Sequence, residues 1–247
     1  MMMQSQRPAG AADKARDAAA PGPTDAIETT GRRVRVWDLP VRLFHWLAAS
    51  LVLAAYLTWR LNWMVWHAWA GDALLTLLLF RLLWGFFGSD TARFSHFLAS
   101  PERAARHLAH IFRRERDLQV GHNPAGGWMV VLLLALLLAQ TLTGLFVDNE
   151  VANQGPLSEL LPAAFANLMN SLHDVILWDA VLAAAALHIL AVLVYGVAKR
   201  HNLLLPMITG SKILPQGVPS PRMTGLLRAL LLLACAAAAA AVLANYL

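Results

Sequence analysis

Residues 172–198 form an apolar stretch that carries two histidines, His173 and His188. An imidazole can exchange a proton near neutral pH or ligate a metal ion, and its cost inside a membrane usually marks a functional site. Fifteen residues of α-helix make four full turns plus about 60° and rise about 22 Å, so both rings leave roughly the same face. The spacing therefore predicts chemistry at two depths of a membrane.

The composition places this stretch in an integral membrane protein. Of the 247 residues, 58% are hydrophobic and only 14% are charged, which is far more apolar than a soluble domain. The net charge is +5, but Lys and Arg lie in loops beside apolar stretches, which indicates topology in a lipid membrane and no nucleic-acid partner. A single cysteine, Cys235, excludes a disulfide framework or a zinc site.

Five apolar stretches each have the roughly 20 residues that a membrane crossing needs. We expect these spans at residues 39–59, 67–87, 127–147, 172–198 and 224–247. The predicted fold is all-α, with a four-helix transmembrane bundle within 34–212, followed by a linker and a fifth transmembrane helix over 213–247. Residues 1–33 lack apolar periodicity and are predicted to be a disordered cytoplasmic tail.

The charges of the connections predict the orientation of the chain. Residues 89–125 hold six arginines, whereas 148–172 hold three acids and no Lys or Arg. By the positive-inside rule, the N-terminus and the 89–125 connection face the cytoplasm. We therefore expect a multi-pass protein of the cytoplasmic (inner) membrane.

With this orientation, four histidines fall into two level pairs. His45 and His188 lie a short way below the cytoplasmic surface, and His67 and His173 lie near the outer surface. Two imidazoles facing each other across a bundle are what bis-histidine ligation of a b-type haem requires. The sequence thus predicts two haems b, with these four histidines as axial ligands of iron. The C-x-x-C-H attachment motif is absent, so coordination alone must hold the haems.

Several other polar residues of the spans have predicted roles. Arg81 is 14 residues after His67, which places it about 21 Å deeper on nearly the same face. A buried arginine at that level is expected to pair with a propionate of the inner haem. Arg42 could likewise pair with a propionate, or its side chain could extend so that the guanidinium group reaches the membrane surface. Gln140, Thr141 and Thr143 are expected to form interhelical hydrogen bonds rather than a quinone pocket. His122 and His201 are expected to be ordinary interfacial residues unless a quinone site lies there.

The chain resembles the bacterial cytochrome b561 family, in particular the branch that includes the b-type cytochrome subunits of nickel-iron hydrogenases. The resemblance covers about 34–212 and rests on VWDLPVRLFHW, HAWAG, FRLLWGFFG, GHNPAGGW and RHNLLLPMITGSK. It implies a four-helix bundle with two haems b, and its ligand pattern falls on the same four histidines. One departure is Asp72, which stands where an aromatic residue is expected. The tail and the fifth span lie outside the resemblance and could dock a partner.

These observations predict a respiratory-chain protein that transports electrons across the inner membrane. We expect it to connect quinone or quinol with a periplasmic c-type cytochrome or oxidoreductase, without a catalytic residue of its own. One alternative is a dedicated membrane subunit of a nickel-iron hydrogenase or a similar quinone-linked oxidoreductase. An alternative of another class is a haem-free transporter or proton channel that uses the histidines, Arg81, Asp72 and Asp179.

Overall fold

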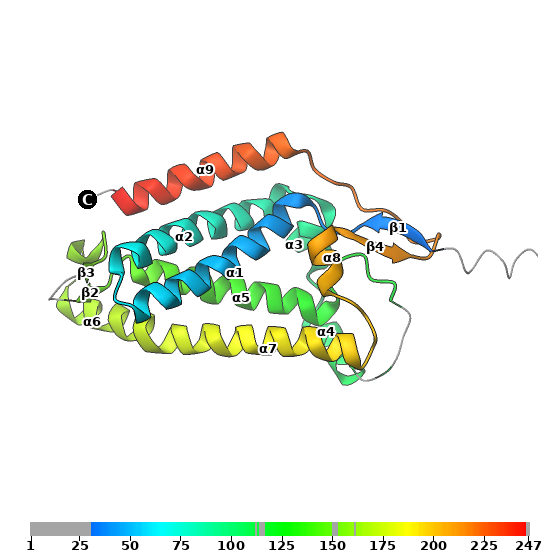
Figure 1. The fold of residues 1–247 in the computed structure, drawn as a ribbon, viewed down its shortest axis with the longest axis horizontal. Helices are drawn as coiled ribbons and strands as arrows, with labels where there is room; N and C mark the ends of the chain where they lie inside the picture. The colour runs from blue at the N-terminus through cyan, green and yellow to red at the C-terminus, as the bar shows by residue number, and fades with distance from the viewer. Residues whose placement is uncertain (1–30, 112, 114–116, 150–152, 161, 246–247) are drawn as a thin grey trace, which may run out of the picture.

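The computed structural model describes residues 31–111, 113, 117–149, 153–160 and 162–245. Long helices run side by side along the body, with short elements at both ends (Figure 1). The predicted tail lies outside the described residues except at its end, where Arg32 and Arg33 belong to strand β1 instead.

Five helical segments are long and apolar enough to cross a membrane, which confirms the predicted all-α membrane fold. They are α1 (Leu39–Arg60), α2 (Met64–Phe87), α5 (Pro124–Gly144), a continuous run from Ala163 to Val197, and α9 (Leu226–Asn245). The fourth run comprises α6 (Ala163–Ser171), a π-helical turn (Leu172–Ile176) and α7 (Leu177–Val197). This run begins earlier than residue 172, because α6 continues directly into the predicted span.

The remaining elements gather at the two ends of the bundle (Figure 1). At one end lie β1 (Arg32–Arg35), η1 (Asp90–Ala92), α3 (Phe94–Phe97), α4 (Pro101–Ala109), α8 (Leu204–Thr209) and β4 (Ser211–Leu214). We call it the basic end, since it includes the arginine-rich connection. At the other end, β2 (Asp148–Asn149), β3 (Asn153–Gln154), η2 (Ser158–Leu160) and α6 form the acidic end.

Side-chain caps fix where two spans begin at the basic end. Asp38 accepts a hydrogen bond from the Val41 backbone N–H at 2.7 Å, and Asn123 accepts one from Gly126 at 2.7 Å. Each helix also has a proline in its first turn, where a missing N–H costs nothing. The caps set the register of α1, and hence the direction in which His45 points.

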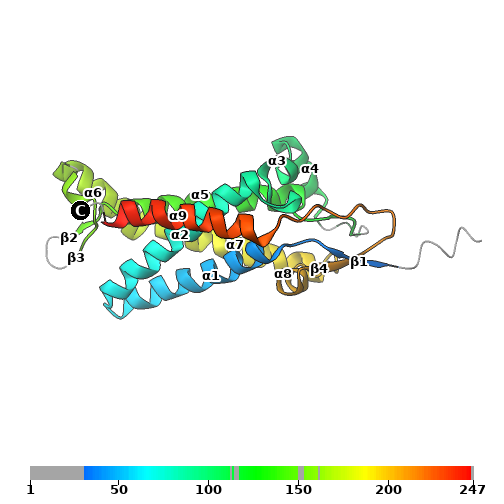
Figure 2. The same cartoon turned by 90° about the horizontal axis from the view of Figure 1, so that it is seen from above.

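Helix α2 is the most buried span, because it packs against α1, α5 and α9. Its side chains Leu75, Leu78 and Trp84 are almost completely buried. Helix α9 lies along α2 in both views (Figures 1 and 2) and buries a face of small side chains, among them Ala236 and Ala240. Small residues allow two helices to approach closely, so the fifth span covers α2 within the chain.

The opposite faces of the outer helices remain apolar and exposed. Leu53 of α1, Ile189 of α7 and Leu231 of α9 are each more than half exposed. Exposed leucines and isoleucines along membrane-length helices are what contact with lipid tails requires. The lipid-facing sides of the spans are therefore mainly apolar, and most polar side chains lie in the interior or at the ends of the bundle.

Candidate functional site

The first histidine pair lies toward the acidic end of the bundle. The ring centroids of His67 on α2 and His173 are 6.2 Å apart, with the rings perpendicular. His67 Nδ1 is 2.9 Å from the carbonyl oxygen of Ala55, and His173 Nδ1 is 2.9 Å from that of Gln140. Because a carbonyl can only accept, each Nδ1 donates and each Nε2 keeps its lone pair. Backbone acceptors orient ligating histidines in this way in metal sites.

The second pair lies toward the basic end. The rings of His45 on α1 and His188 on α7 have centroids 6.2 Å apart and are inclined by 57°. His45 Nδ1 is buried and has no hydrogen-bond partner within the described residues. The structure thus brings together the same histidines that the depth argument paired.

His173 occupies a π-helical turn that the sequence analysis did not predict. In this turn the backbone N–H of Leu177 donates to the carbonyl of Leu172, five residues back. Such turns are often found at functional sites, and the extra residue reduces the angular offset between His173 and His188 from about 60° to about 40°. Regular helical periodicity gives no signal for it.

Helix α5 holds His173 from a second side. The side-chain amide of Gln140 donates to the His173 carbonyl at 2.9 Å, which confirms the interhelical hydrogen bond predicted for Gln140. The prediction was wrong for Thr141, whose hydroxyl donates within α5 to the Leu137 carbonyl at 3.0 Å. A Cβ at Gly144 would lie only 2.8 Å from Cε1 of His173. The ring therefore has room against α5 only because residue 144 is glycine.

Arg81 is buried in α2, only 2% exposed, near the level of the second pair. Its guanidinium lies over the Phe94 ring, 5.5 Å from the centroid. Its Nη1 has no hydrogen-bond partner within the described residues, and the same is true of Nε of Arg42. Arg42 Nη2 donates to the Ile208 carbonyl. Two unsatisfied guanidinium nitrogens are costly unless an anionic group meets them.

The family model of prokaryotic cytochrome b561 matches residues 36–210, which include all four histidines and Arg81. The chain belongs to this family. It is therefore a multi-pass prokaryotic membrane cytochrome that binds b-type haem and takes part in electron transfer. No curated protein and no solved structure matches the chain.

The residues of the cytochrome fit its cofactor. A metal–imidazole bond is about 2 Å long and the ring centroid lies roughly 1 Å behind the nitrogen, so iron held by two imidazoles separates the centroids by about 6 Å. Both pairs have this separation. A Cβ at Gly71, one turn after His67 on α2, would meet nothing within 4 Å, so no protein atom fills that position. Among the described residues, no three His, Cys, Asp or Glu side chains cluster as a metal site.

His122 is a further residue of the basic end whose place the sequence did not reveal. Its ring lies between those of Trp37 and Phe97, with centroids at 4.6 and 4.7 Å. Burial, and to a lesser extent the charges of Arg81 and His188, lowers the pKa of His122 to about 3. The imidazole is thus neutral at physiological pH, and its buried Nδ1 has no partner in the described part of the chain.

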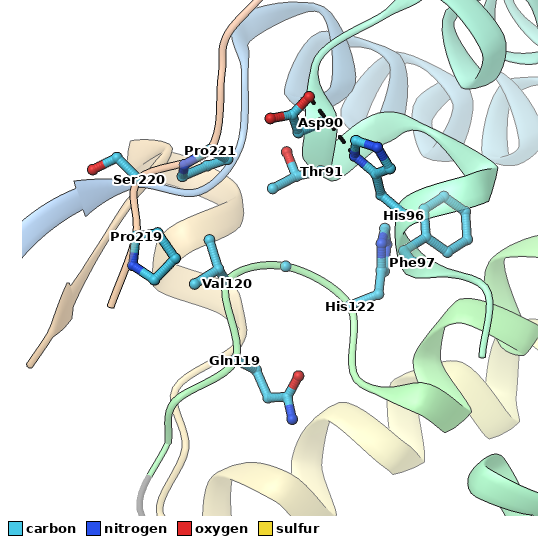
Figure 3. A pocket seen from close by; sticks show the side chains of 11 residues that line it. Asp90, Thr91, His96, Phe97, Gln119, Val120, His122, Pro219, Ser220 and Pro221 are labelled. Carbon is cyan, nitrogen blue, oxygen red and sulfur yellow. Dashed lines mark ion pairs between the residues drawn. The ribbon is translucent and has the colours of Figure 1, made fainter. Parts of the chain in front are cut away.

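A pocket of about 400 Å³ opens beside His122 at the basic end of the cytochrome. Figure 3 shows Asp90, Thr91 and His96 on one side, Pro219 to Pro221 across from them, and the loop of Val120 and His122 between. The lining residues are Asp90, Thr91, His96, Phe97, Gln119, Val120, Gly121, His122, Pro219, Ser220 and Pro221. The GHNPAGGW motif was the sequence signal for this loop, although it gave no sign of the opposite wall.

Proposed function

We propose that this cytochrome carries electrons across the inner membrane through two b-type haems, between the quinone pool and a periplasmic redox partner. The observation that carries the proposal is the presence of two histidine pairs with the same 6.2 Å ring separation in one bundle. His45 and His188 hold the inner haem, and His67 and His173 hold the outer haem. Along the fourth span, the two ligands are about 22 Å apart.

When bound, each haem supplies one-electron exchange at its iron, and the protein controls access and orientation. Two histidines at each iron would leave no site for oxygen, which would favour electron transfer over binding of oxygen. The carbonyls of Ala55 and Gln140 fix the outer imidazoles. Arg81 neutralises a propionate of the inner haem, and Arg42 contributes from α1.

The basic end faces the cytoplasm in this proposal, because Arg and Lys concentrate in its connections. The acidic end then faces the periplasm, where Asp148 and Glu159 lie in the connection before α6. Acidic groups there would steer a basic c-type cytochrome to the outer haem, an effect on encounter more than on affinity. Family membership argues against the haem-free transporter or proton channel, and Asp179 lies exposed on α7 rather than in the bundle interior.

The function can be tested with the purified protein under anaerobic conditions. A short-chain hydroquinone should reduce the b-type absorption bands, and an oxidised basic c-type cytochrome added afterwards should reoxidise them. The proposal is wrong if neither the hydroquinone nor the corresponding quinone changes the redox state of the haems. Copurification of a periplasmic hydrogenase or other oxidoreductase would identify the chain as that enzyme's membrane subunit.

A further inference from the structure

A buried lysine lies just beyond α7, at the basic end of the bundle. Lys199 is only 5% exposed, although lysine side chains are almost never buried unless they are paired. Its ammonium group forms no ion pair with any carboxylate of the described residues. It lies instead over an aromatic ring, with Nζ 5.7 Å from the ring centroid of Tyr195. A buried ammonium without a counterion is costly, so this position suits an anion that the protein itself does not supply.

The backbone at the end of α7 fixes where this lysine lies. The last carbonyls of a helix have no partner within the helix, and here the backbone N–H of His201 donates to the Tyr195 carbonyl at 3.0 Å. The chain turns at Arg200, which adopts a left-handed conformation with φ of 57°. Lys199 is thus held against the helix, whereas the next residue, Arg200, is exposed.

Lys199 and Tyr195 lie on the face of the fourth span that carries the inner ligand. They follow His188 by eleven and seven residues, so at about 100° per residue both fall within about 20° of the direction of His188. They lie about 16 and 10 Å further toward the basic end. Helical side chains tilt toward the N-terminus of their helix, and the contact of Nζ with the Tyr195 ring, one turn earlier, shows this direction for Lys199. The ammonium group is therefore directed back toward the inner haem site.

Tyr195 is itself fixed by α4. Its side chain is buried, and its hydroxyl oxygen lies 2.6 Å from Nε2 of His107. The two rings are inclined by only 23°, with centroids 6.0 Å apart. A cation over the face of an aromatic ring is attracted by the ring quadrupole. A Tyr195 ring that is held in place therefore also keeps the ammonium group of Lys199 in place.

The carboxylates near the basic end already have other partners within the described residues. They belong to Asp38, Asp90, Glu102 and Asp117, which bind Trp84, the Arg222 backbone, Arg106 and Lys212. A b-type haem brings a pair of propionate groups, and Arg81 is assigned to one of them in the proposed function. The other propionate remains as a carboxylate of the inner site that could neutralise Lys199.

We propose that Lys199 binds a propionate of the inner haem from α7, in addition to Arg81 on α2, and that Tyr195 positions its ammonium group. The inference rests on the proposed function, since it requires a haem between His45 and His188. Propionates held from two different helices fix the rotational orientation of the haem. The positive charge of Lys199 also favours the reduced state of the iron and so raises the inner midpoint potential.

The charge is tested by Lys199→Met, with Arg200→Met as the matched control. Both remove one positive charge beyond α7, but Arg200 is exposed and its charge is screened by solvent and salt. In a redox titration of the purified cytochrome in detergent, Lys199→Met should lower the inner midpoint potential and leave the outer one unchanged. Arg200→Met should change neither potential, and Lys199→Arg should keep the unmodified value. An unchanged potential in Lys199→Met, or an equal fall in Arg200→Met, overturns the proposal.

The contact itself is tested by redox-difference infrared spectroscopy of the protein loaded with haem that carries ¹³C in its propionate carboxyl groups. The labelled carboxylate bands should shift in Lys199→Met and keep their positions in Arg200→Met. A lower potential without a shift of these bands would show that the lysine acts only at a distance, which contradicts binding of the propionate.

The positioning role of Tyr195 has its own pair of variants. Tyr195→Leu removes the ring under the ammonium group and should lower the inner potential in the same direction as Lys199→Met, by a smaller amount. Tyr195→Phe keeps the ring and should keep the potential. Equal potentials in the two variants contradict a role of the ring in positioning Lys199.

The outcomes separate this inference from the proposed function. The inner transition is the one that His188→Ala removes, and if this variant loses no haem, the proposed ligand assignment itself fails. If the inner haem is lost there while Lys199→Met changes neither the potential nor the labelled bands, the function stands and the role of Lys199 is wrong. Lys199→Gln, which keeps a hydrogen-bond donor, provides the same comparison if Lys199→Met binds too little haem for a titration.

Discussion

The two histidine pairs have equal ring separations, but the protein holds them in different ways. In the outer pair, both Nδ1 atoms donate to backbone carbonyls, those of Ala55 and Gln140. In the inner pair, His45 Nδ1 has no partner within the described residues. The outer imidazoles are therefore oriented before any haem binds, whereas the inner site depends more on the bound group itself.

The charges around the two pairs also differ. Arg42 precedes His45 by one turn of α1 and Arg81 is buried toward the same end of the bundle, whereas Asp72 follows His67 on α2 and Asp174 directly follows His173. Reduction removes one positive charge from a haem iron, so nearby cations favour the reduced state and nearby anions oppose it. The inner haem should have the higher midpoint potential.

The largest effect is expected when a ligand of one pair is removed. His188→Ala should abolish the inner haem and keep the outer one, and His173→Ala should do the reverse, because each histidine serves a different iron. The haem-to-protein ratio of each variant should be half that of the unmodified protein. His110→Ala should keep the full ratio, and an unchanged ratio in His173→Ala or His188→Ala contradicts the ligand assignment.

A smaller change should disturb only the outer site. Gly144→Ala places a Cβ about 2.8 Å from Cε1 of His173, and such overpacking typically costs 1–3 kcal/mol. The ring must move, so the outer haem should be lost or weakly bound while the inner one remains. Gly196→Ala, whose Cβ meets nothing within 4 Å, is the control. Equal haem retention in the two variants would show that the contact with Gly144 does not position the ligand.

Acid should affect the basic end before the acidic end. The pKa of His122 is lowered to about 3 by burial, against an ordinary value near 6.5, so the unfolded chain binds the extra proton first. Stability that is present above pH 6.5 is therefore lost as the pH falls toward 3. His122→Phe should retain the inner haem to lower pH than the unmodified protein. Identical acid profiles of haem release would contradict this role of His122.

The smallest effect concerns the charge difference between the sites. Arg81→Leu should lower the midpoint potential of the inner haem by an amount of order 1 kcal/mol, because a nearby positive charge is lost. The outer potential should stay unchanged. Arg60→Leu, at the opposite end of α1 from His45, is the control in a redox titration. A shift of both potentials, or of neither, would mean that Arg81 does not face the inner haem.

The sequence predicted the parts of the molecule that the membrane itself constrains. A bilayer fixes the length of each span, and the topology then fixes the depth of each histidine. The pairing of His45 with His188 could therefore be predicted from the sequence alone. Family membership was also predictable, since the motifs around the spans are specific. The ligand roles of these histidines stay a prediction.

Features that depend on contacts between distant segments were not predictable. The π turn at Leu172–Ile176 forms where Gln140 meets the His173 carbonyl. Strand β1 pairs Arg32 with Leu214, across most of the chain. The pocket wall at Pro219 to Pro221 likewise depends on the hydrogen bonds between Asp90 and Arg222. None of these follows from local periodicity, because each is decided by a partner far away in the sequence.

The haem-to-protein ratio of the unmodified purified protein is the most direct test of the central claim. The two histidine pairs predict two b-type haems per chain, seen as two transitions in a redox titration. A fully haem-loaded preparation that contains only one haem per chain, or a preparation that contains no haem, would contradict the claim that both pairs ligate iron.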